Sequence, residues 1–112
     1  MTTIDIMCTE KWKKGVQELA KEVDRPVEWY LRRLLIDVNK SNDYEKLRSE
    51  IEKIKLPKEK GKESQQIKKI HVLEKEKLQR LTKFLGLTMT DFVIKLGQIE
   101  INKKIKKKIK NT

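Results

Sequence analysis

The chain carries nearly the same pattern twice, once towards each end. Each copy has a short segment in which apolar and polar residues alternate, followed by two stretches whose apolar residues recur every three or four positions. Alternation is typical of a strand with one buried face, and the longer period is typical of an amphipathic helix. Because a unit of about 40 residues rarely buries enough apolar surface to fold alone, the two copies are expected to fold against each other.

The first copy is expected in residues 1–40. The alternation from Thr3 to Cys8 predicts a half-buried strand. Thr9 suits a helix N-cap, and Pro26 suits the first position of a second helix. The inward residues of the strand are Ile4, Ile6 and Cys8, and the first helical stripe is Trp12, Val16, Leu19, Ala20 and Val23.

Residues 41–66 are expected to connect the copies. Apolar residues spaced three and four apart predict an amphipathic helix over about 43–56. From Pro57 to Gln66 the chain has no apolar residue, so this stretch has little to bury and is predicted to be a mobile linker.

The second copy is expected in residues 67–102. Ile70 and Val72 alternate with Lys69, His71 and Leu73 and predict a second short strand, and Gly86 is expected to end the next helix. Thr88 or Thr90 is the expected cap of the last helix. Residues 103–112 form a basic tail, for which the pattern allows either a helical extension or a frayed end.

The charge of the chain points to an anionic partner. Of its 112 residues 40% are charged, and the formal net charge is +11, whereas about a quarter of the residues of an ordinary globular protein are charged. Residues 1–56 hold 12 Lys and Arg against 11 Asp and Glu, and residues 57–112 hold 16 against 6, so the halves carry +1 and +10. This asymmetry favours contact with nucleic acid or anionic lipid through the C-terminal half, with a solvated lysine-rich surface as the alternative.

Other function classes find little support. A single cysteine leaves no internal disulfide or multi-cysteine metal site, and one histidine without a glycine-rich phosphate loop argues against an enzyme, a cofactor or a small-molecule substrate. No apolar run is long enough for a signal peptide or a membrane span, so the expected location is the cytoplasm. Abundant Lys, Ile and Glu suit a heat-adapted protein, although an AT-rich genome would give the same bias.

The arrangement resembles the ribbon-helix-helix family of DNA-binding proteins, the MetJ and Arc type. The first copy follows the strand, helix, turn and helix register of that family without a gap from Ile4 to Leu35. In the second copy, whose first helix is read as about two residues shorter, the segment from Gly86 to Val93 sits like the turn of the family. The resemblance covers about residues 2–40 and 67–100.

The resemblance implies a mainly α fold in which two tandem copies form an intramolecular pseudo-dimer around a short antiparallel ribbon. This form is similar to tandem regulators carried by archaeal filamentous viruses, which would place the protein in the cytoplasm of the host cell. The implied function is sequence-specific binding of double-stranded DNA by a transcription regulator, most simply a repressor, with its own gene as one candidate target. Whole chains could also pair on DNA.

The resemblance also implies two sets of contacts with DNA. The outward residues of the two strands would reach base edges in the major groove, and the starts of the second helices together with the basic tail would hold phosphates. The expected base contacts are Thr3, Asp5, Met7, Lys69, His71 and Leu73. The expected phosphate contacts are Arg25, Thr88, Thr90, Lys103, Lys104, Lys106, Lys107 and Lys108.

Several alternatives stay open at this level. Asp5 departs from the family pattern, since DNA phosphates would repel a carboxylate in the groove. One strand could therefore pack against protein instead of DNA. An antitoxin that binds DNA and a protein partner is the second reading, with Ile101, Ile105 and Ile109 as anchors in its tail. A basic helix lying on a membrane would leave the two strands unexplained.

Overall fold

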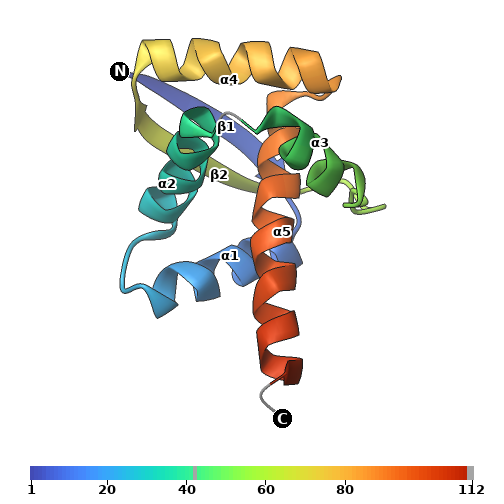
Figure 1. Ribbon diagram of the computed structural model, residues 1–112. Helices are drawn as coiled ribbons and strands as arrows, with labels where there is room; N and C mark the ends of the chain where they lie inside the picture. The colour runs from blue at the N-terminus through green and yellow to red at the C-terminus, as the bar shows by residue number, and fades with distance from the viewer. Residues whose placement is uncertain (42, 111–112) are drawn as a thin grey trace.

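The computed structural model describes residues 1–41 and 43–110, with side chains described to Lys107. The elements follow in the order β1 (Thr2–Cys8), α1 (Glu10–Glu22), α2 (Val27–Lys40), α3 (Tyr44–Glu52), β2 (Glu63–Ile70), α4 (Val72–Leu85) and α5 (Met89–Lys110). The fold is therefore mainly helical with one two-stranded antiparallel sheet (Figure 1), a layout compatible with the ribbon-helix-helix resemblance.

The first half begins and ends its elements near the predicted residues. The Thr9 side chain accepts a hydrogen bond from the Trp12 amide and so starts α1, and Glu10 adds an acidic group to the first turn. Of the predicted stripe, Trp12, Val16, Leu19 and Ala20 are buried, whereas Val23 is 51% exposed because the helix ends there.

The second strand lies earlier in the chain than predicted. It runs from Glu63 to Ile70, so it begins inside the stretch expected to be a mobile linker and ends before Val72. Only Ile67 and Ile70 are buried on this strand, and the rest of its residues are polar. β2 contributes few apolar side chains to the core, and its partner β1 contributes more of them. The composition of β2 alone therefore did not reveal the strand.

The two strands form a ribbon with one irregularity. Asp5 lies opposite Gln66 at the middle of the pairing, Ile4 opposite Ile67 and Thr2 opposite Ile70. One residue separates the last two partners on β1 and two separate them on β2, so β2 carries a bulge at Lys68 and Lys69. The backbone of Lys69 has φ 61, and the extra residue returns Ile70 to the buried face.

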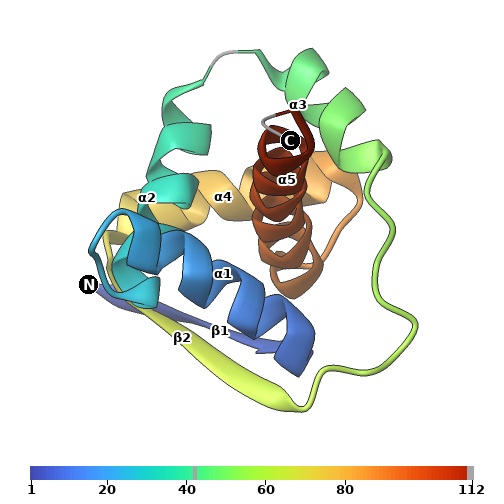
Figure 2. The ribbon, with the colours of Figure 1, turned by 90° about the horizontal axis from the view of Figure 1, so that it is seen from below.

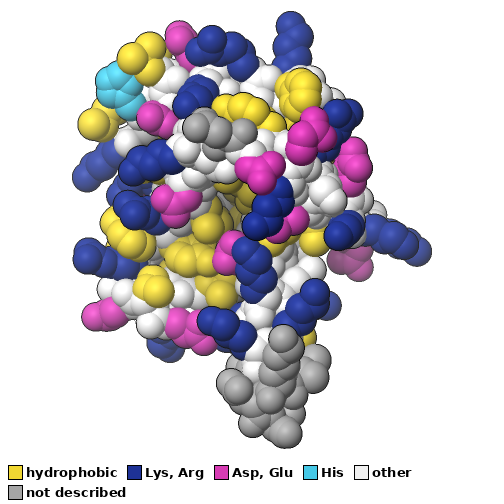
Figure 3. All heavy atoms as spheres, viewed as in Figure 1, with side chains coloured by type: hydrophobic (Ala, Val, Ile, Leu, Met, Phe, Trp, Pro, Cys, Tyr) yellow, Lys and Arg dark blue, Asp and Glu magenta, His cyan; other side chains and the backbone are white. Residues whose placement is uncertain are grey.

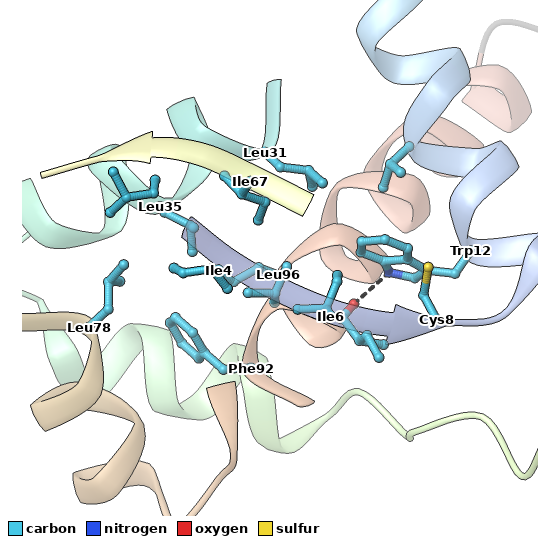
Figure 4. Packing of buried hydrophobic residues seen from close by; sticks show 14 of the residues in the cluster. Ile4, Ile6, Cys8, Trp12, Leu31, Leu35, Ile67, Leu78, Phe92 and Leu96 are labelled. Atoms are coloured by element: carbon cyan, nitrogen blue, oxygen red, sulfur yellow. Dashed lines mark hydrogen bonds between the residues drawn. The ribbon is translucent and has the colours of Figure 1, made fainter. Parts of the chain in front are cut away.

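All helices lie on one side of the ribbon (Figure 2). The inward residues Ile4, Ile6, Cys8, Ile67 and Ile70 join a core that includes Leu31, Leu35, Leu78 and Phe92 (Figure 4). α2 packs against β2 and α5 packs against β1. Each of these helices therefore covers the strand that does not precede it directly in the chain.

The crossing of α1 and α5 is held by an indole group. Trp12 is buried, and its Nε1–H donates to the Ile94 carbonyl oxygen of α5 at 2.8 Å (Figure 4). A Cβ on Gly97 would lie 2.5 Å from the Trp12 ring, and a Cβ on Gly15 would lie 2.6 Å from Ile101. These two glycines let the helices approach closely enough to bury the indole.

The helix caps recur at a constant interval. Thr9 and His71 cap α1 and α4, Asp24 and Gly86 follow these helices with φ 54 and 72, and Pro26 and Thr88 precede α2 and α5. The members of each pair are 62 residues apart. The Arg25 and Leu87 amides donate to the Ala20 and Thr82 carbonyls in the same motif at the two helix ends. The expectation that the first helix of the second copy is shorter is wrong. The second strand ends earlier than predicted, so this helix, α4, already begins at Val72.

Candidate nucleic-acid interface

The outward side of the ribbon is not covered by any described helix (Figure 2). On β1 the residues between the buried ones are Thr3, Asp5 and Met7, with Asp5 exposed and Met7 49% exposed. On β2 the residues on the same side of the ribbon are Ser64, Gln66 and Lys68, all exposed. Gln66 lies opposite Asp5, Ser64 lies opposite Met7, and the bulge lies opposite Thr3. We call these six residues the outer face.

The structure corrects two of the residues expected to face outward on the second strand. His71 is the N-cap of α4, where its Nδ1 accepts a hydrogen bond from the Leu73 amide, and Leu73 lies in the first turn of that helix. Both positions follow the end of the strand. Lys69 is exposed but sits at the bulge. Ser64, Gln66 and Lys68 were missed because polar residues alternate there with only one apolar neighbour, Ile67.

Basic side chains satisfy the backbone at both edges of the ribbon. Lys13 of α1 donates to the Ser64 carbonyl oxygen at 2.9 Å, and Lys75 of α4 donates to the Thr3 carbonyl oxygen at 3.1 Å. Arg32 of α2 donates to the Lys68 carbonyl oxygen at 3.2 Å, while the Glu28 carboxylate accepts from the Lys68 amide at 2.6 Å. These contacts protect the edges from pairing with another strand and place cations beside the outer face.

The starts of α2 and α5 differ in their caps. No side chain caps α2 at Pro26, and the guanidinium of Arg25 lies 4.9 Å from the centre of the Trp29 ring. At α5 the Thr88 hydroxyl accepts from the Asp91 amide, and Thr90 lies in the first turn. The first-turn amides of α2 therefore have no side-chain cap, next to an arginine whose charge attracts anions.

The basic tail continues α5 as a helix to Lys110 (Figure 1). Lys103 pairs with Glu100 at 3.4 Å. Lys104 pairs with Glu22 at 2.9 Å and with Glu18 at 3.8 Å, and its hydrogen bond with Glu22 raises its pKa. Both lysines thus contact carboxylates of this chain, while Lys106 and Lys107 are exposed. The side chain of Lys108 lies outside the described residues.

The face of α2, α3 and α5 that points away from the ribbon mixes both signs of charge (Figure 3). A hollow of about 290 Å³ lies between these helices, and its lining joins the apolar Leu34 and Leu96 to the acidic Asp37, Glu50 and Glu100. A polyanion is less favoured on this acidic lining than on the outer face.

The described residues offer little for chemistry. Cys8 is fully buried, its Sγ lies 3.6 Å from the Glu63 carbonyl oxygen, and burial raises the pKa of its thiol. A buried, protonated thiol is a poor nucleophile. Among residues 1–41 and 43–110 no group of His, Cys, Asp and Glu could hold a metal ion, and none of the helices described there is long and apolar enough to cross a membrane.

Comparison with protein-family models, with curated proteins and with solved structures gave no match to this chain.

Proposed function

We propose that the chain is a tandem ribbon-helix-helix protein whose two halves form a pseudo-dimer. Three observations support this. The helix caps repeat at one interval, α2 and α5 each pack on the strand of the other half, and, apart from the bulge on β2, the strand pairs are arranged symmetrically about Asp5 and Gln66. The Lys13 contact with Ser64 and the Lys75 contact with Thr3 are related in the same way. In this proposal the second half begins at Glu63.

We further propose that the protein binds double-stranded DNA in a sequence-specific way and regulates transcription, most simply as a repressor. The observation that carries this is the uncovered outer face, six alternating side chains with cations at both edges. A two-stranded ribbon fits the major groove, where each base pair presents its own pattern of donors, acceptors and methyl groups. Gln66 would bind adenine, Lys68 guanine, and Asp5 the cytosine amino group.

Phosphate contacts would flank the ribbon. Arg25 and the amides at the start of α2 suit one phosphate, and the start of α5 with Thr88 and Thr90 suits a second. Lys106 and Lys107 would add attraction that does not depend on sequence and falls steeply with salt. Lys103 and Lys104 contribute less in this proposal because carboxylates of the chain already pair with them.

Selection of duplexes from a randomised pool, with competitor DNA and a salt series, tests this function. The protein is expected to enrich one motif at physiological salt. Gln66→Ala should relax the motif, whereas Gln98→Ala on α5, the matched control, should leave it unchanged. Replacing Lys106 and Lys107 by Gln should weaken all duplexes alike and lower the salt slope by about 0.9 per lost phosphate contact. Binding without an enriched motif would contradict specific regulation.

The antitoxin alternative rests on one observation, the exposed Ile105 on the projecting end of α5, which is 51% exposed. Of the other two anchors, Ile101 packs against Gly15, and the side chain of Ile109 lies outside the described residues. An antitoxin would neutralise a toxic protein when the two are expressed together, and Ile105→Asp would abolish that protection. If the protein is a transcription regulator, Ile105→Asp should leave the enriched motif unchanged.

A further inference from the structure

The outer face differs between the two ends of the ribbon. Asp5 and Gln66 lie opposite each other at the centre. Towards one end Thr3 lies opposite Lys68 and Lys69, which we call the lysine end. Towards the other end Met7 lies opposite Ser64, which we call the methionine end. One end thus offers ammonium groups, and the other offers a thioether and a hydroxyl group.

The charged residues beside the ribbon also differ between its two ends. At the lysine end, Lys75 and Arg32 hold the two edges. Glu28, the acidic group that contacts β2 there, already accepts a hydrogen bond from the Lys68 amide.

At the methionine end, Lys13 donates to the Ser64 carbonyl oxygen of the strand. A hollow at the adjoining end of the ribbon is lined by three glutamates and two lysines: Glu10, Glu59, Glu63, Lys60 and Lys62. The lysine end is therefore strongly cationic, and the methionine end is close to neutral.

We propose that the chain binds a directional DNA site in one orientation, with guanine under the lysine end and thymine under the methionine end. The inference rests on the proposed function. A lysine ammonium donates to guanine O6 and N7, whereas an apolar side chain contacts the thymine methyl group. Thr3 and Met7 are four positions apart on an antiparallel strand, about 14 Å, so the guanine and thymine contacts lie about four base pairs apart at about 3.4 Å per pair.

For each of the two proposed contacts, the first test removes one chemical group from the DNA and one from the protein. From the selected site, one duplex carries 7-deazaguanine, which lacks N7, and another carries uracil, which lacks the thymine methyl. The wild-type protein is expected to lose about ten-fold affinity for the first and about five-fold for the second. Lys68→Met should be insensitive to the first change only, and Met7→Ala to the second only. Lys58→Met, which removes the same charge from the loop before β2, should respond like wild type.

The second test measures orientation directly. Cys8 is fully buried, so a cleavage reagent attached to Lys62→Cys reports the position of the methionine end on DNA. Cleavage on the thymine side of the selected site, and on that side alone, is the expected result. Equal cleavage on both sides would overturn the directional proposal.

The outcomes separate the two levels of inference. An enriched motif that is palindromic, or a Lys68→Met variant that weakens all sites equally, would overturn the directional proposal and leave the regulator intact. The absence of any enriched motif for the wild-type protein would overturn the proposed function itself.

Discussion

In the proposed pseudo-dimer, the two halves hold equivalent helix crossings together with opposite chemistry. In the first half, Trp12 stands three residues after its helix cap and fills the space above Gly97 of α5. In the second half, Glu74 stands three residues after its cap, and its backbone and side-chain oxygens accept from the buried Asn39 of α2. Geometry can therefore be kept while an apolar contact is exchanged for a polar one.

The crossing of α2 and α4 also leaves one buried polar atom without a hydrogen-bond partner in the described part of the chain. Lys77 donates to the Asn39 carbonyl at 2.6 Å, but the Asn39 Oδ1 atom is buried without a hydrogen-bond partner among the described residues. An unpartnered buried acceptor costs stability. At the first crossing, in contrast, the buried indole Nε1–H donates to the Ile94 carbonyl oxygen. We expect the first crossing to contribute more to stability.

The largest effect should come from removing the indole. Trp12→Ala empties a fully packed site and should lower the free energy of unfolding by about 3–5 kcal/mol. Denaturation in urea followed by circular dichroism measures this. Trp29→Ala is the matched control, since Trp29 is partly exposed and stacks with Arg25, and it should cost much less. Equal losses in the two variants would refute the special role of the first crossing.

Asn39→Ala probes the second crossing. The variant leaves the Glu74 carbonyl and carboxylate without their donor and should lower the free energy of unfolding by about 1–3 kcal/mol. The control is Asn102→Ala, which removes a more exposed amide of α5. If Asn39→Ala proved more costly than Trp12→Ala, the ranking of the two crossings would be reversed.

A smaller effect is expected where the halves differ in one backbone position. Asp24 adopts φ 54, a conformation that glycine takes without strain, and Gly86 occupies the equivalent position with φ 72. Asp24→Gly should raise the free energy of unfolding by up to about 1 kcal/mol, and Gly86→Asp should lower it by about as much. Thermal unfolding of the pair decides the matter, and shifts of the same sign would speak against the equivalence.

The smallest effect concerns Tyr30, whose equivalent in the second half is the fully buried Phe92. Burial, with the charges of Glu100 and Glu22, raises the pKa of Tyr30 to about 12. The folded state then holds this proton more tightly than the unfolded state, where the pKa is about 10. The stability that it contributes is complete below pH 10 and is lost as pH rises from 10 to 12.

Urea denaturation across this pH range should show a smaller loss for Tyr30→Phe than for wild type. Tyr44→Phe, at a more exposed ring, should keep the wild-type loss. Parallel curves for wild type and Tyr30→Phe would show that the hydroxyl does not carry the effect.

The sequence predicted the helices well because their apolar stripes match their buried faces. The apolar residues at helical spacing, Leu78 and Leu81 of α4 and Phe92 and Leu96 of α5, are buried. The first strand was also predicted correctly, since its alternation is unbroken. These elements carry their own burial pattern, so local periodicity is sufficient.

The second strand could not be found in the same way. Because of the bulge, Ile67 and Ile70 are three positions apart, which breaks the period of two that marks a strand. Its inward face is completed by β1, which lies far away in the sequence. Half of the outer face was missed for this reason. The contacts of Arg32 and Glu28 with the Lys68 backbone, and the contact of Trp12 with Gly97, likewise depend on tertiary packing that no local pattern encodes.

The pairing of Asp5 with Gln66 has a consequence for how such a surface can vary. In a ribbon built from two identical chains, the residue at the centre would face its own copy, and two carboxylates placed opposite each other would repel. Here the partner at the centre is a different residue of the same chain. A substitution therefore changes one position of the ribbon and not two, and the paired strands do not separate on dilution because a covalent connection holds them together.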